Sequence, residues 1–135
     1  MVMTKKNEKK VKRILVVDDD PGIIRLVGSL LTSHGYEVTS AADGLEALVK
    51  IKNEKPDLVV LDIMMPEVNG YDVCYQLRFN QEFEQVPIVI LTIREQELDE
   101  SISQKVNIEY IHKPVDSKVL LAKIEGLLSK EKSSS

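Results

Sequence analysis

The length, charge and cysteine content of the chain limit what it can be. Its 135 residues suffice for one domain with a sizeable core and are too few for two. The formal net charge of -4 at pH 7 argues against a general nucleic-acid-binding surface. The chain holds one cysteine, Cys74, and no apolar run of membrane-spanning length. We therefore expect a reduced, cytoplasmic protein without a membrane segment.

Both ends of the sequence are polar and lack apolar periodicity. We interpret residues 1–11 as a basic flexible tail and residues 131–135 as a polar tail or the start of a linker. The single expected domain covers residues 12–130.

Short apolar runs alternate with segments of helical spacing. Three runs are continuously apolar, which is typical of strands buried on both faces of a parallel sheet: Ile14–Val17, Leu58–Leu61 and Ile88–Leu91. Two weaker strands are expected at residues 37–41 and 109–112. Five alternations of strand and helix predict an α/β fold, with a five-stranded parallel sheet and helices on both faces.

The expected helices have recognisable starts and apolar faces. Asp43 followed by Glu46 resembles a capping box ahead of a helix that carries Leu45, Leu48 and Val49. The other helices are expected over residues 23–31, 71–78 and 95–105, and behind a cap at Asp116.

Reactive side chains follow the carboxyl ends of four predicted strands. In chain order they are Asp18 with Asp19, then Asp62, Thr92 and Lys113. Because ligands of doubly wound sheets bind beyond these strand ends, the sequence predicts one site that holds all five side chains.

Several carboxylates in one small site repel one another, at a cost of about 1 to 4 kcal/mol per contact in partly buried surroundings. A divalent cation removes this repulsion. A few oxygen ligands, with no cysteine or histidine among them, favour Mg²⁺. With such a cation Asp62 can attack phosphorus, while Lys113 supplies positive charge and Thr92 a hydroxyl donor to the phosphoryl oxygens.

From Lys12 to Lys130 these motifs resemble the receiver domain of two-component response regulators. The resemblance is carried by the segments ILVVDDDP from Ile14, VVLDIMMPEVNGYDVC from Val59, IVILTI from Ile88 and YIHKP from Tyr110. It implies a flavodoxin-like sheet of strand order 2-1-3-4-5.

The resemblance also implies a role for each matched residue. Asp62 would be the phosphoacceptor, with Lys113 and Thr92 as its catalytic partners and with Thr92 and Tyr110 as switch residues. The implied metal ligands are Asp18, Asp19, which binds the ion directly, Asp62 and the backbone carbonyl of Met64.

The family's partners follow from the same resemblance. A sensor histidine kinase or a histidine phosphotransfer protein would donate the phosphoryl group. Phosphorylation would switch the surface of the family's fourth helix, fifth strand and fifth helix, which would contact an output domain or form a homodimer. Such a domain binds no nucleic acid directly. It is a signalling module rather than an enzyme, since it catalyses only its own aspartyl phosphorylation and dephosphorylation.

Two other functions fit parts of the sequence. Haloacid-dehalogenase-like phosphatases begin with a strand followed by Asp-x-Asp, which Asp18 and Asp20 satisfy, but Asp62 would then have no role. A pseudo-receiver would keep the fold as a docking module and accept no phosphate. Ile93 favours this reading, because the family usually has a small residue there.

The bulk of Ile93 predicts a long-lived phosphorylated form. Its branched side chain follows Thr92 and would crowd the approach of water to the aspartyl phosphate. Ile93→Ala should therefore shorten the lifetime of the phosphorylated form severalfold, measured as loss of phosphate with time. An unchanged lifetime would show that the steric argument is wrong.

Overall fold

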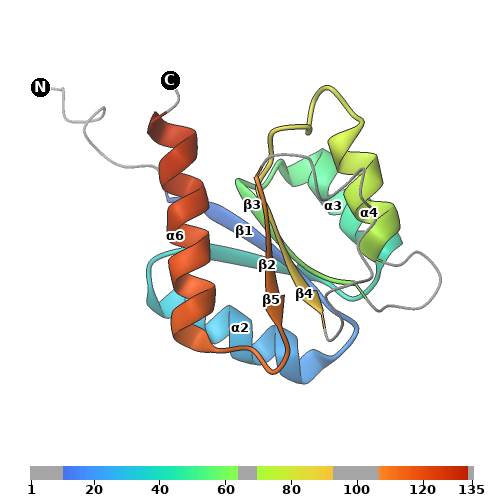
Figure 1. The fold of residues 1–135 in the computed structure, drawn as a ribbon. Coiled ribbons are helices and arrows are strands. Elements are labelled where there is room, and N and C mark those ends of the chain that lie inside the picture. The colour runs from blue at the N-terminus through green and yellow to red at the C-terminus, as the bar shows by residue number, and fades with distance from the viewer. Residues whose placement is uncertain (1–10, 64–69, 93–106, 134–135) are drawn as a thin grey trace, which may run out of the picture.

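The computed structural model of the chain describes residues 11–63, 70–92 and 107–133. Within them, five parallel strands form one sheet in the order β2-β1-β3-β4-β5, which confirms the predicted α/β architecture (Figure 1). The strands are β1 (Arg13–Val17), β2 (Glu37–Ala41), β3 (Leu58–Asp62), β4 (Ile88–Thr92) and β5 (Ile108–His112). The helices of the described residues are α2 (Pro21–Ser33), α3 (Gly44–Glu54), α4 (Gly70–Arg78) and α6 (Ser117–Ser133).

Among the described residues, α3 and α4 cover one face of the sheet, and α2 and α6 cover the other (Figure 1). Alternate strand residues point to opposite faces, so β1 contributes Leu15 and Val17 to one hydrophobic cluster and Ile14 and Val16 to the other. The first cluster is closed by α3 and α4, and the second by α2 and α6. Burial on both faces explains the continuous apolar runs of β1, β3 and β4.

Helix α3 buries a different face from the one its large apolar residues suggest. The Asp43 half of the predicted capping box is present, since the Asp43 carboxylate accepts the backbone N–H of Glu46 at 2.8 Å, while the Glu46 carboxylate accepts the N–H of Ala42, one residue before the cap, at 2.8 Å. The helix nevertheless packs Ala47 and Ile51 against the sheet and leaves Leu45 and Val49 exposed. Both faces have helical spacing, so periodicity alone could not select the buried one.

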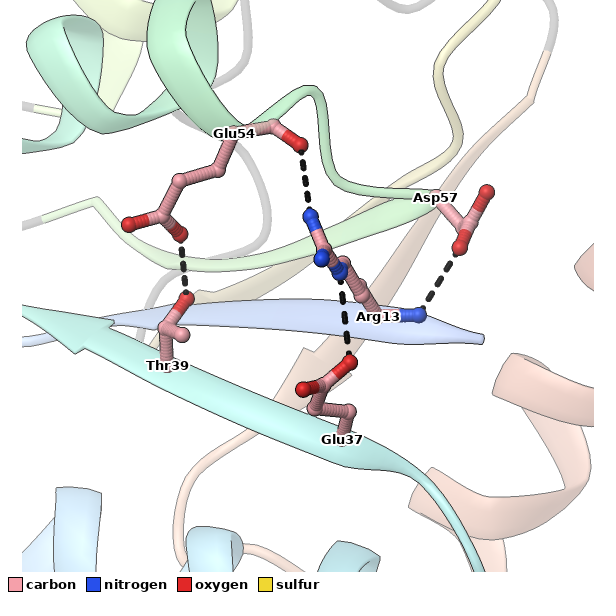
Figure 2. Close-up of polar contacts among 5 residues, drawn as sticks. All are labelled: Arg13, Glu37, Thr39, Glu54 and Asp57. Carbon is pink, nitrogen blue, oxygen red and sulfur yellow. Dashed lines mark hydrogen bonds and ion pairs between the residues drawn. The ribbon is translucent and has the colours of Figure 1, made fainter. Parts of the chain in front are cut away.

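Polar contacts of Arg13 close the amino-terminal edge of the sheet (Figure 2). Its backbone N–H donates to the Asp57 carboxylate at 2.8 Å, and its guanidinium donates to the Glu37 carboxylate and the Glu54 carbonyl, both at 3.2 Å. The Thr39 hydroxyl donates to the Glu54 carboxylate at 3.0 Å. These contacts link β1 to β2, to the end of α3 and to the residue before β3. Because the arginine side chain is half exposed, they contribute little to the stability of the fold.

The last residue of α4, Arg78, is buried and forms hydrogen bonds with two other segments of the chain. Its guanidinium donates to the carbonyls of Phe83 at 3.4 Å, of Val86, and of Asn107 at 3.3 Å. These bonds tie the end of α4 to the segment before β4 and to the residue that precedes β5.

Two expectations concern segments at or beyond the limits of the described structure. The basic tail up to residue 10 and the predicted helix at residues 95–105 lie outside the described residues. Helix α6 continues to Ser133, into the segment 131–135 that the sequence suggests is a polar tail. None of the helices in the described ranges is long and apolar enough to cross a bilayer.

Gly70 lets α4 start directly against the end of β3. Its N–H donates to the Ile63 carbonyl at 3.0 Å. A Cβ atom at this position would overlap the carbonyl oxygen of Asp62 and lie 2.6 Å from the Cα of Ile63. A side chain here would therefore push the helix away from the strand end.

We predict that Gly70→Ala lowers the free energy of unfolding by about 2 kcal/mol or more, because backbone atoms must move. Gly126→Ala is the matched control in α6, where an added Cβ meets nothing within 4 Å. The control should gain about 0.5 to 1 kcal/mol, since alanine loses less backbone freedom in a helix than glycine. Urea denaturation measures both, and a Gly70→Ala variant as stable as the parent would contradict the steric argument.

Candidate functional site

The predicted site residues come together at the carboxyl edge of the sheet. Asp62 ends β3, Thr92 ends β4, and Asp18 and Lys113 directly follow β1 and β5. The strand order reverses between β1 and β3, which lie side by side, so this edge is the topological switch point of the sheet.

Three carboxylates form a compact acidic cluster here. Asp18, Asp19 and Asp62 each offer an oxygen, and these oxygens all lie within 4.8 Å of one another. Asp18 is 0% and Asp62 2% exposed, whereas Asp19 is open to solvent. The Oδ1 atom of Asp18 accepts the backbone N–H of Asp20 at 2.9 Å. The cluster therefore combines two buried acids with one that faces water.

The ammonium of Lys113 is ion-paired with both buried acids. Its Nζ lies 3.3 Å from Asp62 Oδ1 and 3.4 Å from Asp18 Oδ2. Burial lowers the pKa of Lys113, but the attraction of Asp62 and Asp18 outweighs that effect and the pKa is raised overall. The ammonium form is therefore favoured. The Lys113 backbone N–H donates to the Thr92 carbonyl at 2.9 Å, which fixes the start of this side chain beside β4.

The two expected switch residues lie on neighbouring strands. Thr92 is 4% exposed and pairs in register with His112, next to Lys113. Tyr110 pairs with Ile90, and its ring packs against the hydrophobic cluster under α3 and α4. Burial raises the pKa of the Tyr110 hydroxyl, which has no hydrogen-bond partner among the described atoms.

Of the other residues considered from the sequence, Asp20 has a structural role, and Met64 and Ile93 lie outside the residues that the structure describes. Asp20 is the N-cap of α2, where its carboxylate accepts the Gly22 N–H at 2.8 Å. Met64, whose carbonyl was an expected metal ligand, and Ile93 lie outside the described residues. The sequence alone assigned Gly70 no role, although a glycine at the start of a helical segment was a visible signal.

The acidic cluster fits a hard divalent cation. All of its donors are carboxylate oxygens, the ligands that Mg²⁺ and Ca²⁺ prefer. Ligand oxygens around Mg²⁺ lie about 3 to 4 Å apart, given metal–oxygen distances of about 2.1 Å. The upper limit of 4.8 Å on the oxygen separations in the acidic cluster is close to that spacing.

Comparison with known proteins shows which family of sequences this chain resembles. The sequence model of the response regulator receiver domain family matches residues 14–125. The chain is 41% identical to the alkaline phosphatase synthesis transcriptional regulatory protein PhoP of Bacillus subtilis over 87% of its own length and 48% of PhoP. It is 36% identical to protein PilH of Pseudomonas aeruginosa over 87% of its own length and 98% of PilH. It thus spans about half of one relative and nearly all of the other.

A solved structure agrees with this comparison. The fold superposes with a TM-score of 0.84 on a CheY-like response regulator receiver domain protein from Methanospirillum hungatei, at 31% identity. The match covers 93% of this chain and 100% of the other.

The ion pairs of Lys113 predict that substitutions of Lys113 and Asp62 have non-additive effects on the free energy of unfolding. Lys113→Met should lower the free energy of unfolding in metal-free buffer by about 1 to 3 kcal/mol, because two buried carboxylates lose their cation. The loss should be smaller when Asp62→Asn has already removed one of them, so a double-mutant cycle should give a coupling energy above about 0.5 kcal/mol.

Lys118→Met is the matched control, because this exposed lysine forms no ion pair within the described residues. It should leave stability within about 0.5 kcal/mol of the parent. Equal stabilities of the two lysine variants would show that Lys113 does not hold the acids.

Proposed function

We propose a phosphoacceptor function for this chain, because the chain belongs to the response regulator receiver domain family. In this proposal Asp62 accepts a phosphoryl group, and the domain passes the resulting change to a partner. The observation that carries the proposal is the position of Lys113 Nζ, between two buried carboxylates at 3.3 and 3.4 Å, with Asp19 close by.

The proposed reaction is an in-line transfer to a carboxylate. An oxygen of Asp62 forms a bond to phosphorus while the bond to the donor's nitrogen or oxygen breaks, and the donor keeps that electron pair. Asp62 is suited to this role because the Lys113 ammonium favours its ionised form. The same ammonium lies where it can hold the negative phosphoryl oxygens, and the Thr92 hydroxyl can donate to them.

The three carboxylates of the acidic cluster would hold Mg²⁺, together with the carbonyl of Met64 as the resemblance implies. When bound, the ion would neutralise charge on the phosphoryl oxygens. Asp18 and Asp19 each offer an oxygen to this cluster, and the exposed Asp19 would give donor and solvent access to the ion.

The proposal extends to partners, location and limits of the domain. The donor would be a sensor histidine kinase or a histidine phosphotransfer protein in the cytoplasm. Thr92 and Tyr110 would transmit phosphorylation to the surface formed by the family's fourth helix, β5 and α6, for an output domain or a second copy.

The domain would extend over residues 12–130, slightly beyond the family match at 14–125. The chain would catalyse only its own phosphorylation and dephosphorylation.

A direct test uses a small phosphodonor. The chain mixed with acetyl phosphate and Mg²⁺ should gain the mass of one phosphoryl group, because the donor needs only Asp62, Lys113 and the metal site. Asp62→Asn should gain none, and removing the metal with a chelator should abolish labelling of the parent. Intact-mass spectrometry measures all three.

Asp116→Asn is the matched control for removing a carboxylate. Asp116 caps α6 by accepting the N–H groups of Lys118 and Val119, a role that asparagine also fills, and it lies outside the acidic cluster. This variant should be labelled like the parent. Absence of label in the parent would favour a pseudo-receiver, and repeated turnover of a phosphate monoester would favour a phosphatase. Either result would refute the proposal.

A further inference from the structure

Strand β5 has fewer neighbours and less burial than the other strands that lead to the site. Within the described sheet it pairs with β4 alone, whereas β1, β3 and β4 each pair with two strands (Figure 1). All five residues of β4 are buried, but in β5 only Ile111 is. Such a strand can separate from a sheet while the rest stays folded. The bonds at its two ends therefore decide how often β5 opens.

Asn107 joins the amino end of β5 to the segment before β4. Its backbone carbonyl accepts the N–H of Ile88, the first residue of β4, at 2.9 Å. Its side-chain amide donates to the Gln85 carbonyl at 3.2 Å. Its φ of 64° lies in the left-handed region, which asparagine tolerates better than most residues. Both the backbone and the side chain of Asn107 thus hold the start of β5 in place.

Arg78, at the end of α4, adds a further bond to Asn107. Its terminal nitrogen Nη2 donates to the Asn107 carbonyl at 3.3 Å and also to the Val86 carbonyl, so one atom bridges the segments that lead into β4 and β5. The other terminal nitrogen, Nη1, donates to the Phe83 carbonyl at 3.4 Å. A guanidinium suits this position, because its planar group of donors can reach several acceptors at once.

The charge of Arg78 is buried at a cost in free energy. The residue is 3% exposed, and its Nε–H has no hydrogen-bond partner among the described atoms. Burial lowers the pKa of the guanidinium more than nearby groups raise it. An apolar side chain would avoid these costs but would lose all three carbonyl contacts. Those contacts are therefore what the arginine contributes.

We propose that Arg78 and Asn107 form a latch that controls the local opening of β5 and thereby positions Lys113. At the other end of the strand, the Lys113 backbone N–H donates to the Thr92 carbonyl at 2.9 Å. Release of the latch leaves β5 attached to β4 by fewer bonds, so the whole strand opens more often. An open β5 withdraws the Lys113 ammonium from the two buried acids.

The opening of β5 is a property of the chain without a phosphodonor. Its consequence for phosphoryl transfer rests on the proposed function, but the opening itself is measured without that reaction. Failure of the latch and failure of Asp62 as a phosphoacceptor would therefore be distinguishable.

Hydrogen exchange of backbone amides, followed by NMR, tests the latch. The Lys113 N–H faces β4, so by alternation those of Glu109 and Ile111 do as well, whereas Val16 and Val60 lie in the central strands β1 and β3. In the parent chain the three β5-side amides should exchange at least about tenfold faster than the two central ones. Their exchange should also rise less with urea, because opening one strand exposes less surface than global unfolding.

Arg78→Met should accelerate the three β5-side amides by about tenfold more than the two central ones, because the closed strand loses its link to α4. Arg13→Met is the matched control at the opposite edge of the sheet. It removes a guanidinium that bonds to the Glu37 carboxylate and the Glu54 carbonyl, and it should leave the β5-side amides unchanged.

Asn107→Ala tests the other half of the latch and does not depend on the folding of Arg78→Met. Alanine lacks the amide that bonds to Gln85 and is strained at a positive φ, so this variant should also accelerate the β5-side amides selectively. Asn107→Gly loses the same side-chain bond without the backbone strain, and its effect should be smaller.

Three results would overturn the proposal. In the parent, the β5-side amides could exchange only through global unfolding, with the urea dependence of the central amides. In Arg78→Met and Asn107→Ala, all five amides could accelerate equally or not at all, which would leave no specific control of β5. The acceleration could also stop short of Lys113, which would show that the latch does not position this residue.

Discussion

The contact of one ammonium group with two buried carboxylates is the interaction on which the site depends. Asp18 and Asp62 are almost inaccessible to water, and a buried charge without a partner costs free energy. Lys113 supplies this partner, because its Nζ lies 3.3 Å from the Asp62 carboxylate and 3.4 Å from the Asp18 carboxylate. The same burial lowers the local dielectric, which strengthens whatever charge the site offers to a phosphoryl group.

The fold creates this contact by bringing together residues distant in sequence. Lys113 and Asp18 are 95 residues apart and belong to strands that are not neighbours, with β3 and β4 between them. Only a parallel sheet with a fixed register places the ends of β1, β3, β4 and β5 at a common edge. The two hydrophobic clusters hold that register, because slipping a strand by one residue would exchange its two buried faces.

Helix α4 connects the site to the rest of the molecule. Its first residue, Gly70, touches the backbone of Asp62, and its last, Arg78, is hydrogen-bonded to the residue that precedes β5. Between them the helix buries Cys74 and leaves Tyr75 partly exposed.

The sequence by itself determined the strands, the helix caps at Asp43 and Asp116, and which reactive side chains stand at the strand ends. These features are local: continuous apolar runs mark strands buried on both faces, Asp43 and Asp116 cap the helices that follow them, and reactive groups stand at strand ends. Tertiary structure decided which helix face is buried, and it turned Ala47 rather than Leu45 toward the sheet. It also decided that Arg78 is internal and that Gly70 abuts Asp62, because such contacts arise only when separate elements pack together.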